Sequence, residues 1–127
     1  MDFVRRFHGD FGYVAIVLNA VSGLYALAAW RWPRLRGRPV WVGVIVAEAA
    51  LMVQVFLGVL LVTNHTWKGY VKPPRFHMFY GFVAFITVGL LYSYRYIWQA
   101  RGWMELAYGL GGLFIMGLGI RAVLQVM

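Results

Sequence analysis

Four long apolar stretches constrain the fold of this chain more than any other feature of its sequence. They cover about residues 11–30, with a start as early as residue 3, and about residues 40–62, 74–98 and 103–124. A helix needs roughly 20 apolar residues to cross a bilayer, and each stretch meets that length. Prolines separate the first three stretches, at Pro33, Pro39, Pro73 and Pro74. The sequence therefore predicts an all-α integral membrane protein, an up-and-down bundle of four transmembrane helices.

The composition supports a single membrane domain over residues 1–127. Hydrophobic residues make up 62% of the chain and charged residues 13%, with a mean hydropathy of +0.69, whereas soluble domains are about half apolar and a quarter charged. The chain has no cysteine, which excludes disulfides, thiolate metal sites and cysteine nucleophiles. The net charge is +8, but the basic residues lie between apolar stretches. We therefore expect the lipid bilayer, and not nucleic acid, as their partner.

The lysines and arginines divide equally between the two membrane faces that this topology predicts. One face carries Arg5, Arg6, Lys68, Lys72, Arg75 and Arg121, and the other carries Arg31, Arg34, Arg36, Arg38, Arg95 and Arg101. The short segment RWPRLRGR, residues 31–38, contains no acidic residue. Its charge density favours that face as cytoplasmic and the opposite face as external. The membrane we expect is the bacterial cytoplasmic membrane.

One sequence motif occurs twice, at the start of the first and third predicted helices. Residues 6–15 read RFHGDFGYVA and residues 75–84 read RFHMFYGFVA, so that Arg, Phe, His, Gly, Val and Ala coincide at an offset of 69 residues. The repeat indicates an internal duplication of a two-helix unit, a paired site, or both.

The two histidines of this repeat, His8 and His77, are candidate metal ligands. The first and third helices run in the same direction, so both histidines lie at one membrane face, on helices that are normally diagonal in a bundle. Diagonal imidazoles can approach a metal-centred ring from opposite sides. Gly12 and Gly81 follow one turn deeper on the same helix face and would leave room for a porphyrin edge. Basic residues at this face, Lys68, Lys72 and Arg75, would neutralise the heme propionates.

The segment FHMFYGFVAFITVGLLYSYR, residues 76–95, resembles the ligand-bearing helices of heme b membrane cytochromes. In particular it is similar to the ascorbate-dependent transmembrane ferric-reductase family, and quinone-linked heme b anchors such as those of succinate dehydrogenase also use His-x-x-x-Gly. The resemblance implies heme b, electron transfer and axial ligation by His8 and His77. Those reductases hold two hemes on four histidines. The second and fourth predicted helices here have no histidine, so at most one heme is expected, near the membrane interface.

Other interpretations of this face remain open. His65 lies in the loop at the same face, so His8, His65 and His77 could together form a copper or zinc site. Alternatively, the histidines are interfacial polar residues and Gly12 and Gly81 are packing positions. The protein would then be a non-catalytic structural or assembly subunit of a larger membrane complex, or a homo-oligomer. Its glycine-rich last helix, with Gly112 and Gly117, would provide the contact surface.

Glu48 is the one acidic residue well inside a predicted span. An ionisable group at that depth predicts a functional site. Glu48 would relay protons or line a quinone pocket, together with Gln54 and Asn19. The alternative is that Glu48 only fixes the packing of its helix.

Overall fold

The computed structural model describes residues 2–97 and 103–126, with residues 94–97 described by their backbone alone. The described chain consists of helices and connecting loops. Its elements are α1 (Asp2–Arg31), the 3₁₀ turn η1 (Pro33–Leu35), α2 (Arg38–Thr63), α3 (Arg75–Ile97) and α4 (Trp103–Leu124). All four α-helices are long and apolar enough to cross a membrane. The structure thus confirms an all-α bundle of four helices, in an integral membrane protein.

The helices agree with the apolar stretches, with one extension. α1 contains 30 residues and is therefore about 45 Å long, against a hydrocarbon thickness of about 30 Å. Its first turns carry the polar residues of the repeat and continue the helix beyond the apolar stretch. The predicted end of the third helix at Trp98 lies outside the described residues.

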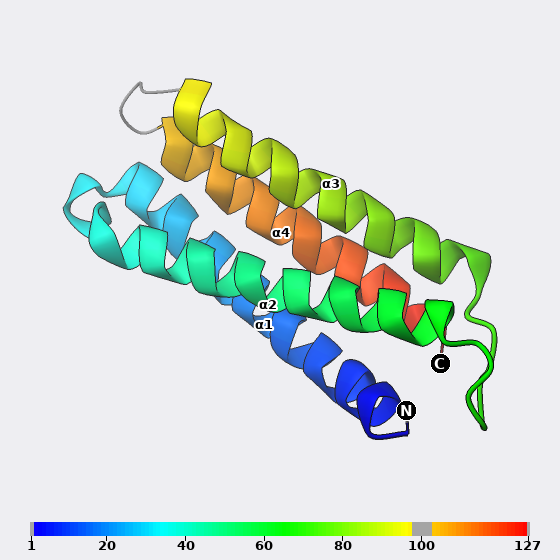
Figure 1. Ribbon diagram of the computed structural model, residues 1–127. Coiled ribbons are helices and arrows are strands. Elements are labelled where there is room, and N and C mark those ends of the chain that lie inside the picture. The colour runs from blue at the N-terminus through cyan, green and yellow to red at the C-terminus, as the bar shows by residue number, and fades with distance from the viewer. Residues whose placement is uncertain (1, 98–102, 127) are drawn as a thin grey trace.

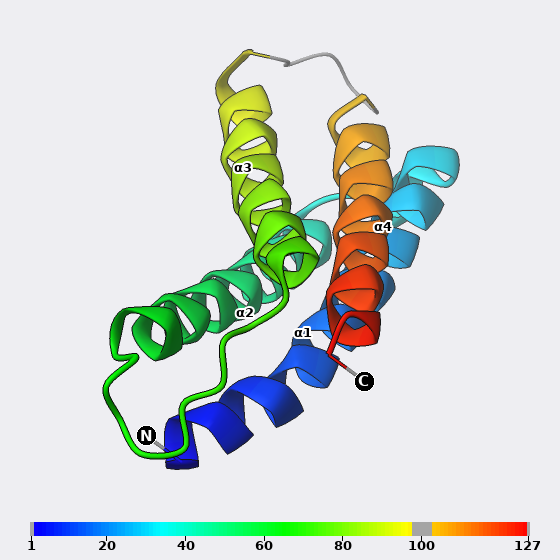
Figure 2. The same ribbon diagram turned by 90° about the vertical axis from the view of Figure 1, so that its right-hand side faces the viewer.

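The chain runs up and down through the bundle (Figure 1). The N-terminus, the α2–α3 loop and the C-terminus lie at one end, hereafter the histidine end, and η1 lies at the other. α1 packs extensively on α4 and on α2, and α3 packs on α4 (Figure 2). The α2–α3 contact is much smaller. α1 and α3 are therefore diagonal, as the sequence predicts, but the bundle is not symmetric.

Glycines explain the close packing of α1 on α4. A methyl group added at Gly23 would lie 2.9 Å from the carbonyl oxygen of Gly109, and one added at Gly112 would lie 3.0 Å from the carbonyl oxygen of Asn19. Gly119 similarly faces Ile16 of α1. Small residues let membrane helices approach closely, and here they do so within one chain. Of the two glycines that the sequence offers as a contact surface for another subunit, Gly112 is therefore occupied by α1, whereas Gly117 has no described atom within 4 Å of an added Cβ.

The core of the bundle is rich in small residues beside a few larger ones such as Leu91, Tyr108 and Ile115, while most large apolar side chains face outward. Buried alanines occur on α1, α2 and α3: Ala15, Ala26, Ala29, Ala47, Ala50 and Ala84. Exposed valines, leucines and phenylalanines cover the outside, among them Val17, Leu24, Phe56, Phe82 and Phe114. A lipid environment accounts for this distribution, because lipid tails solvate such side chains as well as a protein core does.

The connection between α1 and α2 is held by side chains that bind the end of α1. The Arg36 guanidinium donates hydrogen bonds to the carbonyl oxygens of Ala29 (2.9 Å) and Trp30 (2.8 Å). These carbonyls belong to the last turn of α1, where the helix itself offers few donors. Gly37 follows with a φ of 114°, a conformation that favours glycine. The turn thereby directs α2 back alongside α1.

Candidate functional site

The two histidines of the repeat meet at the histidine end of the bundle. The ring centroids of His8 on α1 and His77 on α3 lie 6.1 Å apart, and the ring planes form an angle of 79°. Both side chains are half-buried. Since α1 and α3 are diagonal helices, the rings meet across the bundle and not along one helix face. The predicted pairing of His8 with His77 is therefore present in the structure.

His77 is oriented by a hydrogen bond to the last helix. Its Nδ1 lies 2.9 Å from the carbonyl oxygen of Ala122 on α4. Because a carbonyl oxygen can only accept, Nδ1 carries the hydrogen and Nε2 carries the lone pair. Metal-binding histidines are commonly held in this way, with one nitrogen bound to a backbone carbonyl and the other directed at the metal. The arrangement prepares His77 to act as a ligand through Nε2.

His8 lies against α2. A methyl group at Gly58 would come within 3.2 Å of the His8 Cε1 atom, so Gly58 leaves the space that the ring uses. The Nδ1 atom of His8 is buried and has no hydrogen-bond partner among the described residues. A buried polar atom without a partner needs an explanation, and an absent ligand is one of the recognised explanations.

Gln54 on α2 supports the same region of α1. Its Nε2 donates a hydrogen bond of 2.6 Å to the carbonyl oxygen of His8, and the same atom would lie 3.1 Å from a methyl group at Gly12. The space beside Gly12 is therefore occupied by Gln54. Gly81, in contrast, has no described atom within 4 Å of the position its Cβ would take. Of the two glycines of the repeat, only Gly81 therefore has open space beside it.

The other predicted site residues of this end lie at its surface. Lys72 and Arg75 are exposed, next to the start of α3. His65 is exposed in the α2–α3 loop and packs against the ring of Tyr70, at 6.1 Å between centroids. Within residues 2–97 and 103–126, no group of three or more histidine, aspartate or glutamate side chains is placed to hold a metal ion. The structure therefore does not bring His65 together with His8 and His77, because the His65 ring packs against Tyr70.

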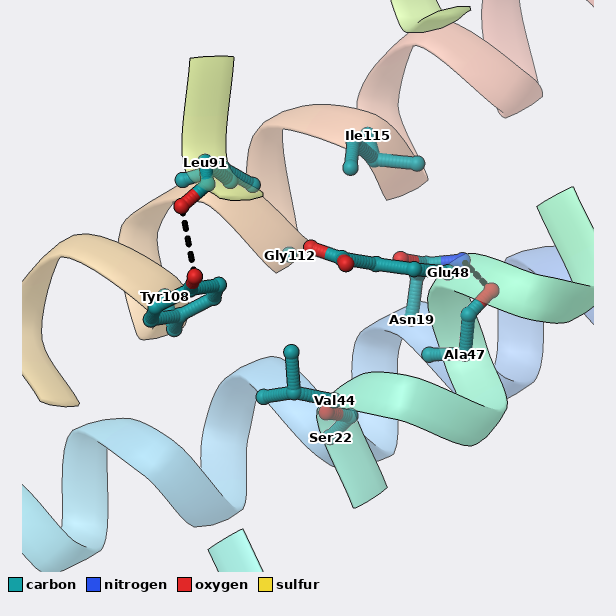
Figure 3. A pocket seen from close by; sticks show the side chains of 9 residues that line it. All are labelled: Asn19, Ser22, Val44, Ala47, Glu48, Leu91, Tyr108, Gly112 and Ile115. Atoms are coloured by element: carbon teal, nitrogen blue, oxygen red, sulfur yellow. Dashed lines mark hydrogen bonds between the residues drawn. The ribbon is translucent and has the colours of Figure 1, made fainter. Parts of the chain in front are cut away.

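Glu48 and Asn19 line one cavity near the centre of the bundle (Figure 3). Gln54 is not part of this lining, so its grouping with Glu48 is wrong. The reason is helix geometry: six residues on a helix correspond to about 9 Å along the axis and to a rotation of about 240°. Asn19 is 2% exposed, and its Nδ2 donates to the carbonyl oxygens of Ala15 (2.9 Å) and Ala47 (3.3 Å).

Two residues of the histidine site escaped the sequence analysis. Gly58 is one of many glycines in the chain, and only the position of α2 shows that it faces His8. Ala122 contributes a backbone carbonyl, for which a sequence offers no signal.

A comparison of the chain with protein-family models, with curated proteins and with solved structures found no match. The function is therefore inferred from the residues of the site itself.

Proposed function

We propose that this protein is a small membrane cytochrome that binds one heme b between His8 and His77 and takes part in electron transfer. The observation that carries the proposal is the meeting of these two rings, from diagonal helices, at one end of the bundle. The resemblance of the third helix to heme b membrane cytochromes agrees with it.

The separation of the rings suits two axial ligands on one metal. An imidazole nitrogen binds a metal at about 2.0–2.1 Å, and the ring centre lies roughly 1.1 Å further, so two opposed rings on one metal have centres roughly 6 Å apart. The centroids of His8 and His77 are 6.1 Å apart. The distance between the two ring centres is thus close to the one that two imidazoles sharing a metal would have, which supports the proposal.

The number of ligands favours heme over a bare metal ion. Zinc in proteins takes four ligands, of which at least three are usually side chains. The described residues offer two histidines and no third histidine, aspartate or glutamate placed with them. Heme iron needs axial ligands only, because the porphyrin supplies the remaining nitrogens. Two histidines fit that requirement.

The roles of the surrounding residues follow from their contacts. The Ala122 carbonyl fixes the His77 ring with Nε2 as the donor of an electron pair, and Gln54 holds the backbone of α1 at His8. The exposed cations Lys72 and Arg75 can neutralise propionate groups. A bound heme would supply a one-electron redox couple. A membrane-soluble quinone is the electron partner that the resemblance suggests.

An absorption spectrum of protein expressed with a heme supply tests the proposal. The wild-type protein is expected to show a Soret band and reduced α and β bands, and His8→Ala and His77→Ala are each expected to lose most of the bound heme. His65→Ala is the matched control and should keep the spectrum. A wild-type protein that folds and shows no Soret band contradicts the proposal, as does a spectrum unchanged by both substitutions.

We further propose that the protein lies in the bacterial cytoplasmic membrane with the segment 31–38 in the cytoplasm and the histidine end outside. The density of arginines in that segment supports this orientation. The alternative function, a structural or assembly subunit, loses the support of Gly112, which packs inside the bundle, and keeps that of Gly117, which has open space beside it. Association with other membrane subunits or with a second copy stays a prediction.

A further inference from the structure

We propose that Glu48 forms a second site in the middle of the bundle, where it holds a proton as a neutral carboxylic acid beside one bound water molecule. This inference does not depend on heme, because the site lies at a different depth from the two histidines. Glu48 is about 15 Å along α2 from the first residue of that helix, close to the bilayer centre.

The cavity at Glu48 has contributions from all four helices. Asn19 and Ser22 line it from α1, Val44, Ala47 and Glu48 from α2, Leu91 from α3, and Tyr108, Gly112 and Ile115 from α4. Its volume of about 10 Å³ matches the space that one water molecule needs, by the same measure. Figure 3 shows the Glu48 carboxyl group extending into the space between the helices.

The carboxyl group has unused hydrogen-bonding capacity. The Oε1 atom of Glu48 is buried and has no hydrogen-bond partner among the described residues. Two of the nearby donors are already engaged, since Tyr108 donates its hydroxyl hydrogen to the Leu91 carbonyl oxygen at 2.5 Å and Asn19 donates to two carbonyls. A single water molecule in the cavity would supply the missing partner.

The charges around Glu48 favour its neutral form. Apart from Glu48 itself, the lining residues of α1, α2, α3 and α4 carry no formal charge, and the phenol of Tyr108 is the only other titratable group among them. An ionised carboxylate in an apolar interior without a counter-charge or donors is very costly, so the group takes up a proton instead. Glu48 therefore carries a proton, which takes the place of the positively charged side chain that an ionised carboxylate would need.

The site also has an approach from the lipid. Ser22 lines both this cavity and an open groove of about 300 Å³ between α1 and α2. The groove is mostly apolar, and two of its lining residues, Val21 and Val46, face outward at 61% and 48% exposure. Gly43 also lines the groove, and a Cβ atom added there would lie 3.5 Å from the Ser22 hydroxyl oxygen. A small apolar molecule in the bilayer can thus reach Ser22, which also lines the cavity of Glu48.

Dicyclohexylcarbodiimide is a suitable probe, because it dissolves in lipid and reacts with protonated carboxyl groups. The acid adds across one C=N bond, its proton moves to nitrogen, and rearrangement leaves a stable N-acylurea without a leaving group. In the full-length protein in liposomes, we expect one adduct, on Glu48, and a labelling rate that falls several-fold as the pH is raised. Glu48→Gln should abolish the adduct, whereas Glu105→Gln, in the first turn of α4, should keep it.

Two further measurements make the test independent of the reagent. The infrared spectrum at neutral pH should contain the carbonyl stretch of a neutral acid, shifted in D₂O and missing in Glu48→Gln. Gly43→Leu, which fills the groove, should slow labelling several-fold and leave that infrared band unchanged. His8→Ala should alter neither result, which separates this inference from the heme proposal. Absence of both adduct and band overturns the inference, as does protection by sodium ions at constant pH, which would indicate a metal cation site.

Discussion

Gln54 is the residue on which the geometry of His8 most directly depends. It reaches from α2 to the His8 carbonyl oxygen at 2.6 Å and fills the space that Gly12 leaves on α1. Its Oε1 atom is buried and without a hydrogen-bond partner in the described chain. Gln54 therefore fixes the position of α1 along its axis, and its rotation, at His8. The unpartnered Oε1 atom of Gln54 can accept a hydrogen bond from a ligand or a water molecule at the same site.

We expect Gln54→Leu to destabilise the protein by about 0.5–1.5 kcal/mol, the net contribution of one hydrogen bond. Thermal unfolding in mild detergent, followed by circular dichroism, measures the change. Val53→Leu is the control, because that neighbouring side chain is 45% exposed and faces lipid. Equal melting temperatures for all three proteins would show that Gln54 does not hold α1.

The histidine pair could be predicted from the sequence, but the role of Gln54 could not. α1 and α3 run in the same direction, and His8 and His77 each lie near the start of a helix. The two histidines therefore share one membrane face, however the helices pack. The inward face of α2, by contrast, depends on the rotation of that helix. α2 is apolar on all sides, so its sequence carries no stripe that distinguishes core from lipid. For this reason the sequence groups Gln54 with Glu48, whereas in the structure Gln54 contacts His8.

The helices show how four similar apolar elements become an asymmetric bundle. α1 and α4 meet through Gly23, Gly109 and Gly112, while Gly81 and Gly89 of α3 have no described atom within 4 Å of an added Cβ. The number, length and direction of the helices followed from hydropathy and prolines. Which pair packs closest did not, because glycine-rich faces look the same in sequence whether they meet a helix of the same chain or another subunit.

Gly23→Ala is expected to destabilise the bundle by about 1–3 kcal/mol, the usual cost of overpacking a tight contact. The added methyl group would lie 2.9 Å from a backbone oxygen of α4, and a backbone atom cannot move aside as a side chain can. Thermal unfolding in detergent measures the loss.

Gly117→Ala is the matched control on α4, since no described atom lies within 4 Å of the new Cβ. This change should be neutral or stabilising by up to about 1 kcal/mol, because alanine favours a helix more than glycine does. If Gly23→Ala and Gly117→Ala have the same effect, the close approach of α1 and α4 does not determine stability.

In the molecule as a whole, two polar sites lie at different depths of one small bundle. The histidines are near one membrane face and Glu48 is near the bilayer centre, so their chemistry is spatially separate. Large apolar side chains surround both levels. Under the proposed function, the side of the membrane on which the histidine end opens decides which aqueous compartment a water-soluble electron donor or acceptor would come from.

The orientation can be measured without background, because the chain has no native cysteine. We expect Thr66→Cys, in the exposed α2–α3 loop, to react with a membrane-impermeant maleimide in intact cells. Arg34→Cys, in the exposed η1 turn, should react only after the cells are opened. The reverse pattern would place the histidine end in the cytoplasm and contradict the proposed orientation.

The extensive contact between α1 and α4 also has a consequence for biogenesis. These are the helices furthest apart in the chain, so during synthesis α1 must wait in the membrane until the three later helices have left the ribosome. In that interval the face of α1 around Gly23 is uncovered and can bind another protein in the membrane. A membrane-resident chaperone, or rapid synthesis of α4, would protect this face of α1 from binding another protein.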